Sequence, residues 1–265
     1  MYRKHFGFSR SAFSKDIDIN DLFDSMSTKE MHTRLNYLID LRGIGLFTGE
    51  PGAGKTTACR RAVSLLHAGR HRVFYVSLST GNVMDTYKTI AWEMGLPTER
   101  SRSSLFKAIQ AEVSRLCSEH RLMPVLIVDE AHHLRSDVLE DLRLLTNYRM
   151  DSENRLCLLL VGHAELRRRI GMAVHESLAQ RIVVRFHMQG LARDELPPFL
   201  GHLLRLAGTE TQLFDPAAME AIFQATHGLP RRICVLAQHT LNAAALARAV
   251  VATEEHVRLA VNEVM

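Results

Sequence analysis

Residues 46–57 read LFTGEPGAGKTT, an apolar run that breaks into glycines and ends in Lys-Thr-Thr. Within this stretch, residues 49–56 fit the pattern G-x-x-x-x-G-K-[ST]. Glycines let successive backbone N–H groups turn inward on a phosphate, and the N-terminus of a following helix favours the same negative charge. The residues expected to bind a nucleotide in this turn are Gly49, Glu50, Pro51, Gly52, Ala53, Gly54, Lys55, Thr56 and Thr57.

Two side chains of this turn have specific expected roles. Lys55 is expected to be an exposed loop side chain that reaches the β- and γ-phosphate oxygens, and Thr56 to offer its hydroxyl to Mg²⁺. The alternative is a glycine-rich turn that only joins a strand to a helix. A second motif makes that alternative remote.

The second motif is VLIVDEAHH, residues 125–133. Its four apolar residues place Asp129 at the C-terminal end of a buried strand, where ligands gather in open α/β sheets. We expect Asp129 to hold Mg²⁺, directly or through water, and Glu130 to polarise an attacking water molecule. Alone, an acidic pair after a strand could equally cap a helix. Downstream of the glycine-rich turn, the magnesium interpretation is favoured.

His132 and His133 follow this acidic pair directly. A metal site would need further ligands at a suitable spacing, and the sequence names no third ligand. Both histidines are therefore expected to be surface or interface residues.

Short apolar runs alternate with longer helical stretches, which predicts a doubly wound α/β fold with a parallel sheet. The predicted strands are 43–49, 72–78, 124–130, 155–162 and 181–188, and the predicted helices are 55–68, 83–95, 103–120, 137–149 and 165–179. After Met188 only helical spacing remains, broken by Gly, Pro or an Asp-Pro start. We expect an N-terminal segment at 1–40, an α/β core at 41–189 and a small all-helical domain at 190–265.

Composition bounds the class of protein. Hydrophobic residues make up 46% and charged residues 23% of the chain, as in ordinary globular proteins. The N-terminus has no continuous apolar segment, and the longest apolar run, 156–162, is too short to span a bilayer, so we expect a cytoplasmic protein. The four cysteines are scattered, which indicates reduced thiols. A net charge of +4 is compatible with a polyanionic partner but does not prove one.

Three polar side chains stand near the ends of predicted elements: His163 after the fourth strand, Arg181 before the fifth, and Arg231 at a helix start. An arginine has a fixed charge and a bidentate fork, which suit charge developing on a phosphate. Most single arginines are nevertheless solvated surface groups. His163 could equally be a turn residue at a strand end.

Taken in order, GEPGAGKTT, LIVDEAHHL, LLVGHAELRRRI, LAQRI and GLPRRI resemble the AAA+ ATPases of the ExeA-like group. This group includes the general-secretion assembly ATPase and, closely related, transposition-helper ATPases of the TniB, TnsC and MuB type. The resemblance covers residues 5 to about 260. It implies a P-loop (ASCE) core with a helical lid, ATP and Mg²⁺ as cofactors, and an ATP-dependent homo-oligomer.

The resemblance also assigns roles. Lys55 and Thr56 form the Walker A pair, Asp129 and Glu130 the Walker B pair, and Arg231 is the lid arginine called sensor 2. Arg181 matches the arginine finger, which enters the neighbouring subunit's site. His163 takes the sensor 1 position, where the chain departs from the family: it has His163-Ala164 where the family often has Gln-Pro after the fourth strand. Phe6 and Phe13 are assigned to the adenine pocket, with aromatic core packing as an equal alternative.

Secretion-type members continue after the ATPase into a membrane span, whereas this sequence stops at Met265. We therefore expect the transposition branch: an ATPase that assembles on duplex DNA, as a ring or filament, and recruits a transposase. The alternatives are a secretion or envelope assembly ATPase and a nucleotide-gated scaffold with incidental hydrolysis. The residues expected to face DNA are Lys88, Arg100, Arg102 and Lys107.

Overall fold

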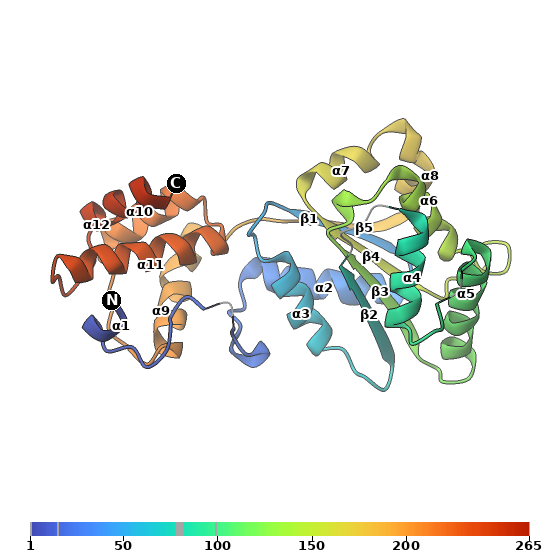
Figure 1. Ribbon diagram of the computed structural model, residues 1–265, viewed down its shortest axis with the longest axis horizontal. Helices are drawn as coiled ribbons and strands as arrows, with labels where there is room; N and C mark the ends of the chain where they lie inside the picture. Colours follow the sequence, from blue (N-terminus) through green and yellow to red (C-terminus); the bar gives the residue numbers. More distant parts are fainter. Residues whose placement is uncertain (1, 15, 78–81, 99, 265) are drawn as a thin grey trace. The chain divides into compact units, whose positions relative to one another are not determined.

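The computed structural model describes residues 2–14, 16–77, 82–98 and 100–264. Five parallel strands form one sheet in the order β2-β3-β4-β1-β5 (Figure 1). The strands are β1 Ile44–Gly49, β2 His71–Ser77, β3 Met123–Asp129, β4 Cys157–Gly162 and β5 Ile182–Met188. The predicted parallel α/β sheet is confirmed, and Leu78, the last residue of the predicted strand 72–78, lies outside the described residues.

The register of the sheet brings three strand ends together. Strand β4 lies between β3 and β1, with Val128 opposite Leu160 on one side and Gly162 opposite Thr48 on the other. Because all strands run in the same direction, their carboxyl ends lie at one edge of the sheet. The glycine-rich turn after β1 and the acidic pair at the end of β3 therefore flank the end of β4.

Helix α2 Met26–Leu41 precedes the first strand, and one or two α-helices connect each pair of consecutive strands. The connecting helices are α3 Lys55–Ser64, α4 Val83–Glu93, α5 Arg102–Ser118, α6 Ser136–Leu145, α7 Ala164–Ile170 and α8 Glu176–Arg181. The single helix predicted over 165–179 is wrong. Helix α7 ends at Ile170, directly before Gly171, because glycine is a poor helix former. A 3₁₀ turn then spans Ala173–His175, and α8 begins at Glu176. Helix α2 was not predicted.

Alternate strand residues face opposite sides of the sheet. Leu46, Leu126 and Leu160 belong to one apolar cluster with buried residues of α4, α5, α6, α7 and α8. On the other face Gly45 lies against α2, where a Cβ at this position would approach Leu38 Cδ2 to 2.4 Å. The strands are thus buried on both faces, which explains their continuous apolar sequences.

The chain divides into two compact units. The sheet unit comprises Glu30–Gly49 and Lys55–Met188, and the helical unit comprises Met1–Lys29, Glu50–Gly54 and Gln189–Met265. The helices of the helical unit include α1 Tyr2–His5, α9 Leu196–Leu206, α10 Pro216–Thr226, α11 Pro230–Leu246 and α12 Glu254–Val264 (Figure 1). Helix α12 was not predicted.

Prolines and a capping aspartate start the helices of the helical unit. Helices α9, α10 and α11 each have Pro in the first turn, where no N–H is needed, and Asp215 accepts a hydrogen bond from the Ala218 N–H at the start of α10. The N-terminal aromatics pack here: Phe13 is buried in the apolar cluster of this unit, and Phe6 packs against it. Their role in an adenine pocket stays a prediction.

Candidate functional site

The turn after β1 has the backbone that its glycines allow. Gly52 has φ +84° and Gly54 φ +96°, in the left-handed region that favours glycine. Lys55 is the first residue of α3, and its Nζ donates a hydrogen bond to the Gly49 carbonyl at 2.9 Å. The side chain is 7% exposed, so the expectation of an exposed loop lysine is wrong. As the first residue of α3, Lys55 is held against the strand that precedes the turn.

Asp129 is a buried carboxylate at the end of β3 that accepts three hydrogen bonds. Its Oδ2 accepts hydrogen bonds from Thr56 Oγ1 at 2.7 Å and from Tyr75 Oη at 2.8 Å. Its Oδ1 accepts one from the Glu130 N–H at 2.8 Å. Asp129 is 2% exposed, and three donors satisfy a carboxylate that would otherwise be costly to bury.

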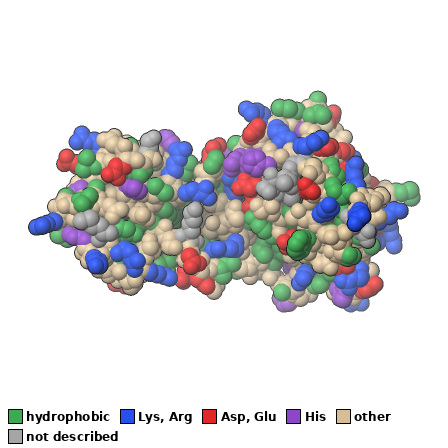
Figure 2. Space-filling view, in the orientation of Figure 1, with side chains coloured by type: hydrophobic (Ala, Val, Ile, Leu, Met, Phe, Trp, Pro, Cys, Tyr) green, Lys and Arg blue, Asp and Glu red, His purple; other side chains and the backbone are tan. Residues whose placement is uncertain are grey.

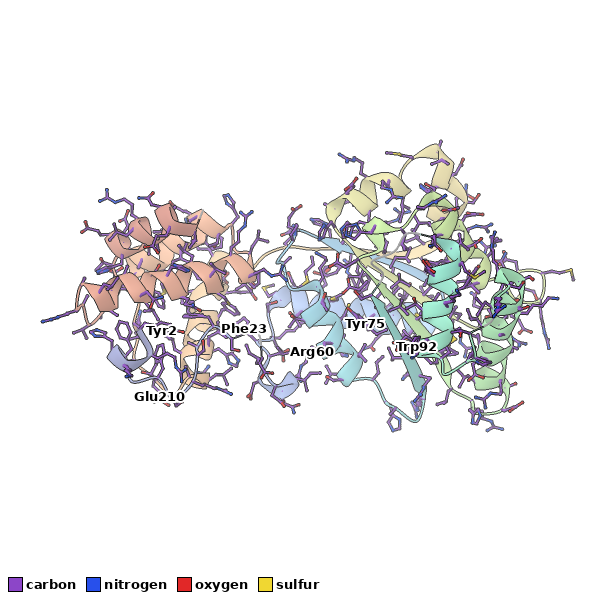
Figure 3. All side chains as sticks on the ribbon, viewed as in Figure 1. Tyr2, Phe23, Arg60, Tyr75, Trp92 and Glu210 are labelled. Atoms are coloured by element: carbon purple, nitrogen blue, oxygen red, sulfur yellow. The ribbon has the colours of Figure 1, made fainter. Side chains whose placement is uncertain are left out.

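Tyr75 was missed by the sequence analysis. It lies on β2, where it is labelled in Figure 3, and burial, followed by its hydrogen bond to Asp129, raises the pKa of its hydroxyl. The pairing of Ser77 with Asp129 brings the two strand ends together. Only the strand order could have revealed this contact, because nothing in the local sequence joins residue 75 to residue 129.

The side chains at this edge suit a magnesium ion bound to phosphate. Mg²⁺ prefers oxygen ligands and is held in nucleotide sites by one or two carboxylates, hydroxyls and phosphates. The Thr56 hydroxyl and the Asp129 carboxylate supply such oxygens from two different elements, 2.7 Å apart. The predicted Walker A and Walker B side chains are therefore adjacent in space.

Glu130 has an unusual backbone. Its φ of +55° and ψ of +29° lie in the left-handed region, which is uncommon for a residue with a side chain. Such outliers cluster at functional sites. Its side chain is 40% exposed, and Oε2 lies 3.4 Å from His132 Nδ1 and 3.8 Å from His163 Nε2. Two histidines thus lie beside the predicted water-activating carboxylate.

Three histidine rings lie beside Glu130, with His163 stacked on His132 and His133 tilted against it. The His132 ring lies 3.8 Å from the His163 ring and 4.0 Å from the His133 ring, centroid to centroid. The His132 side chain is only 7% exposed, so its expected surface position is wrong, whereas His133 is exposed. Burial, then the nearby His163 and His133, lower the pKa of His132. Figure 2 shows histidine side chains gathered beside acidic ones on the visible face.

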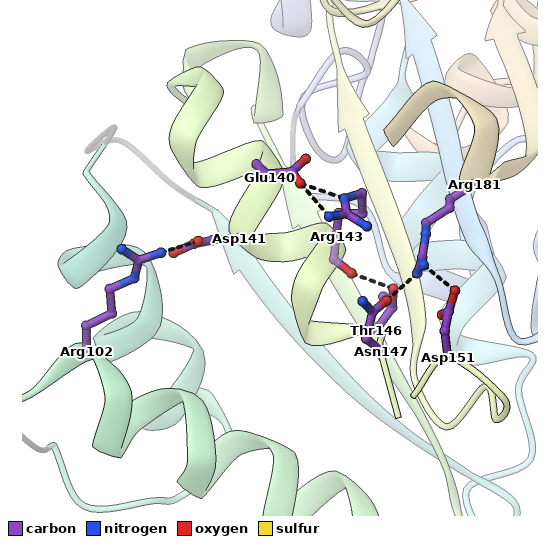
Figure 4. A network of polar contacts seen from close by, with 8 residues as sticks. All are labelled: Arg102, Glu140, Asp141, Arg143, Thr146, Asn147, Asp151 and Arg181. Atoms are coloured by element: carbon purple, nitrogen blue, oxygen red, sulfur yellow. Dashed lines mark hydrogen bonds and ion pairs between the residues drawn. The ribbon is translucent and has the colours of Figure 1, made fainter. Parts of the chain in front are cut away.

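Arg181 ends helix α8 and is held within its own chain. Its guanidinium donates hydrogen bonds to Asn147 Oδ1 and Asp151 Oδ2 (Figure 4). The side chain is 27% exposed and is paired within the unit, whereas the sequence predicted that it would project from the edge of the domain toward a neighbouring subunit. Any contact with another subunit would therefore require exchange of these partners.

Arg231 lies at the start of α11 with its side chain exposed. Its N–H donates to the Gly52 carbonyl at 3.2 Å, and a Cβ on Gly52 would lie 2.9 Å from the Arg231 Cβ. This contact lies within the helical unit, which includes residues 50–54. The backbone of the predicted sensor 2 arginine therefore contacts the glycine-rich turn.

The residues expected to face DNA differ in their surroundings. Arg102 forms an ion pair with the buried carboxylate of Asp141 (Figure 4), whereas Lys88, Arg100 and Lys107 are exposed. None of the helices in the described part of the chain is long and apolar enough to cross a membrane.

Two curated relatives are similar to this chain in sequence. General secretion pathway protein A of Aeromonas hydrophila is 33% identical over 248 residues, which cover 92% of this chain and 45% of that protein. ATP-dependent target DNA activator B of Escherichia phage Mu is 26% identical over 143 residues, which cover 53% of this chain and 41% of that protein. The chain thus spans less than half the length of either relative.

The fold has solved counterparts. The crystal structure of Cdc6p from Pyrobaculum aerophilum superposes with a TM-score of 0.73 at 18% sequence identity, and the match covers 96% of this chain and 71% of that one. Residues 39–170 match the family described as "AAA domain". These residues include all of β1, β3 and β4, and with them the Lys55, Thr56 and Asp129 arrangement. Residues 39–170 therefore form a domain of the AAA family, and the chain resembles the ExeA-like group of AAA+ ATPases.

Proposed function

We propose that this protein binds ATP with Mg²⁺ and hydrolyses it to ADP and phosphate. The observation that carries the proposal is the 2.7 Å contact between the Thr56 hydroxyl and the Asp129 carboxylate. It joins the first residues of the helix after β1 to the end of β3, with Lys55 next to Thr56. Residues 49–57 would bind the phosphates, with Thr56 and Asp129 as the magnesium ligands.

The chain's own groups would do the following. Lys55 would exchange its Gly49 carbonyl partner for β- and γ-phosphate oxygens. Thr56 and Asp129 would hold Mg²⁺, which neutralises phosphate charge when it is bound. Tyr75 would keep the Asp129 carboxylate oriented through its hydrogen bond.

Glu130 would orient and deprotonate the attacking water. The water oxygen bonds to the γ-phosphorus as the bond to the β–γ bridging oxygen breaks, and the proton passes to the Glu130 carboxylate. Its 40% exposed side chain leaves room for a water molecule. His163, with Nε2 at 3.8 Å from this carboxylate, would act in the sensor 1 position.

The two arginines would stabilise charge on the transferred phosphoryl group. Arg231 would act from the lid, in line with its backbone contact to Gly52. Arg181 would act on a neighbouring subunit's nucleotide, as arginine fingers do. Its guanidinium is satisfied in cis by Asn147 and Asp151. Assembly would therefore replace these partners with the neighbour's phosphate.

The proposed client is duplex DNA, with a transposase recruited to the assembly. The phage Mu relative is an ATP-dependent target DNA activator by name, and Lys88, Arg100 and Lys107 offer exposed cations. Contacts to phosphates are independent of sequence and weaken steeply with salt. Arg102 is a weaker candidate than the other three, because Asp141 already pairs with it.

A second candidate function rests on the general secretion protein, which is 33% identical to this chain over 92% of its length. In this role the ATPase would drive assembly in the cell envelope. A nucleotide-gated scaffold with incidental hydrolysis is the third candidate.

Fluorescence anisotropy of a labelled duplex distinguishes these candidates, with Glu130→Gln used to hold the ATP-bound state. The DNA role predicts that this variant binds duplex only with ATP, and that affinity falls as salt rises. The control is Lys55→Ala, which should not respond to ATP. Lack of ATP-dependent binding at low salt, in a preparation that hydrolyses ATP, would reject the DNA role and favour the other two.

A further inference from the structure

A cluster beside the predicted nucleotide site has the ligands of a transition-metal site. Glu130, His132 and His133 each offer one ligand atom, and these atoms lie within 4.8 Å of one another. No third ligand for the two histidines could be named from the sequence, and the structure supplies one in Glu130. Carboxylate and imidazole ligands suit zinc-like dications, whereas Mg²⁺ prefers oxygen alone.

The distance between the Glu130 and His132 ligand atoms already fits two ligands of one metal ion. Zn²⁺ binds imidazole nitrogen and carboxylate oxygen at about 2.0–2.2 Å, so two tetrahedral ligands are separated by about 3.4 Å. Glu130 Oε2 and His132 Nδ1 are 3.4 Å apart. The remaining ligand, on His133, is exposed and has room to adjust its side chain.

The buried nitrogen of this pair has no hydrogen-bond partner. His132 Nδ1 is enclosed, its side chain is 7% exposed, and no described residue forms a hydrogen bond with it. A buried polar atom left without a partner is destabilising, so such an atom needs an explanation. A cation coordinated by this nitrogen and by the neighbouring carboxylate satisfies both groups.

The protein holds the cluster in place from two sides. Arg169 of α7 donates hydrogen bonds to the carbonyls of His132 and Leu134, both at 2.7 Å. The His163 ring stacks on the His132 ring with an angle of 23° between their planes. These contacts hold the 3₁₀ turn Ala131–His133 in place, which lowers the cost of ordering the ligands.

We propose that Glu130, His132 and His133 form a binding site for a zinc-class transition-metal dication that inhibits the protein. Coordination occupies the Glu130 carboxylate, so this group no longer accepts a proton from water. Nucleotide binding, which uses other residues, is retained. The inhibition rests on the proposed ATPase function, whereas the metal site does not.

Direct binding tests the site without any ATPase assay. Metal-free protein is titrated with Co²⁺, whose visible absorption reports low-coordinate nitrogen and oxygen ligands, and then with Zn²⁺ to displace it. We expect one site per chain in the wild type, weakened about tenfold or more in both His132→Asn and His133→Asn. The control is His120→Asn, which removes an exposed histidine outside the cluster and should leave this site intact.

Inhibition is tested with Zn²⁺ added to ATP in excess Mg²⁺. We expect the wild-type rate to fall at least tenfold and to return when a chelator removes the zinc. In His133→Asn, the rate relative to that variant's own metal-free rate should respond only at about tenfold higher zinc.

The two failures are distinguishable. If wild type and His133→Asn bind Co²⁺ and Zn²⁺ equally, the metal site is wrong, whatever the protein hydrolyses. If the site binds metal and metal-free protein hydrolyses ATP at a rate that zinc does not change, the inhibitory role is wrong. If metal-free protein shows no hydrolysis while the site binds, the proposed function fails and the inhibitory role fails with it, but the metal site stands.

Discussion

Two polar regions of the sheet unit are built differently. At the ends of β1 and β3, Lys55, Thr56 and Asp129 are paired with groups of the same site, and the central carboxylate is 2% exposed. At the end of α8, Arg181 is paired with Asn147 and Asp151, which belong to no predicted site. The first region brings its functional groups together in a single chain, and the second does not.

The difference follows from where each group has to act. Groups that contact the same nucleotide gain from being preorganised by neighbouring strands, because their contacts then cost no further ordering. A guanidinium that acts on another subunit has no such target in its own chain. Asn147 and Asp151 of its own chain then accept hydrogen bonds from two of its five donors until assembly. Five predictions test this contrast, beginning with the largest expected effect.

Removing the lysine ammonium should abolish the activity of the first region. Lys55→Ala is expected to lower ATP hydrolysis by about 10³-fold or more, because the phosphates lose their nearest charge. Because Lys55 is buried, Lys55→Met is the matched variant that keeps the apolar stem and removes only the ammonium. Phosphate release measures both. Wild-type turnover in either variant would remove the phosphate-binding role.

Removing the guanidinium tests whether the second region acts between subunits. Arg181→Ala should bind ATP but hydrolyse it about 10³-fold more slowly, and wild-type turnover should rise more than linearly with protein concentration. Mixing Arg181→Ala with Glu130→Gln should restore activity, since some interfaces regain both groups. The finger role fails if the two variants co-assemble without any recovery, or if Arg181→Ala alone is fully active.

Weakening the ion pair between Asp151 and Arg181 should favour assembly of subunits. Asp151→Asn removes the charge that pairs with Arg181, and Asn tolerates the left-handed backbone at this position, where φ is +67°. We expect half-maximal cooperative hydrolysis at a several-fold lower protein concentration. Glu153→Gln is the control, because Glu153 pairs with Arg149 and Arg155 instead. An identical response in both variants would argue against the cis partner's role.

Tyr75→Phe tests whether the hydrogen bond to Asp129 stabilises and orients this buried carboxylate, and its expected effect is smaller than those above. The variant removes one of three donors to Asp129 and keeps the ring, so the free energy of unfolding should fall by about 1 kcal/mol. Turnover should fall a few-fold, because the carboxylate loses part of its orientation. Chemical denaturation and phosphate release measure the two effects. No change in either quantity would mean that the hydrogen bond is dispensable.

The smallest expected effect is a pH dependence near the second region. His175 precedes α8 and is 4% exposed, and burial, then Arg169, lower its pKa below the usual 6.5. The unfolded chain therefore takes up this proton at a higher pH than the folded chain. Neutral His175 therefore contributes to the stability of the folded protein above pH 6.5. This contribution is lost as the pH falls through the lowered pKa of His175 in the folded chain. The free energy of unfolding should drop less between pH 7.5 and pH 5 in His175→Gln than in the wild type, and an equal drop would contradict the assignment.

The strands, which are continuous apolar runs, were predictable from the sequence. All five strands were predicted to within two residues at either end, because strands covered on both faces are continuously apolar. The error over 165–179 arose where apolar spacing continued across Gly171, which interrupts the helix. Helix α12, Glu254–Val264, was not predicted from the sequence.

The sequence by itself determined the phosphate-binding turn, the acidic pair and the strands that carry them, because each depends on residues that are neighbours along the chain. Only the tertiary structure decided that Tyr75 binds Asp129, that Asp151 binds Arg181, and that His163 stacks on His132. These partners come from separate elements, and their contacts depend on strand order, register and helix ends. A one-residue shift in register moves every side chain of a strand to the other face, so local sequence cannot specify such pairs.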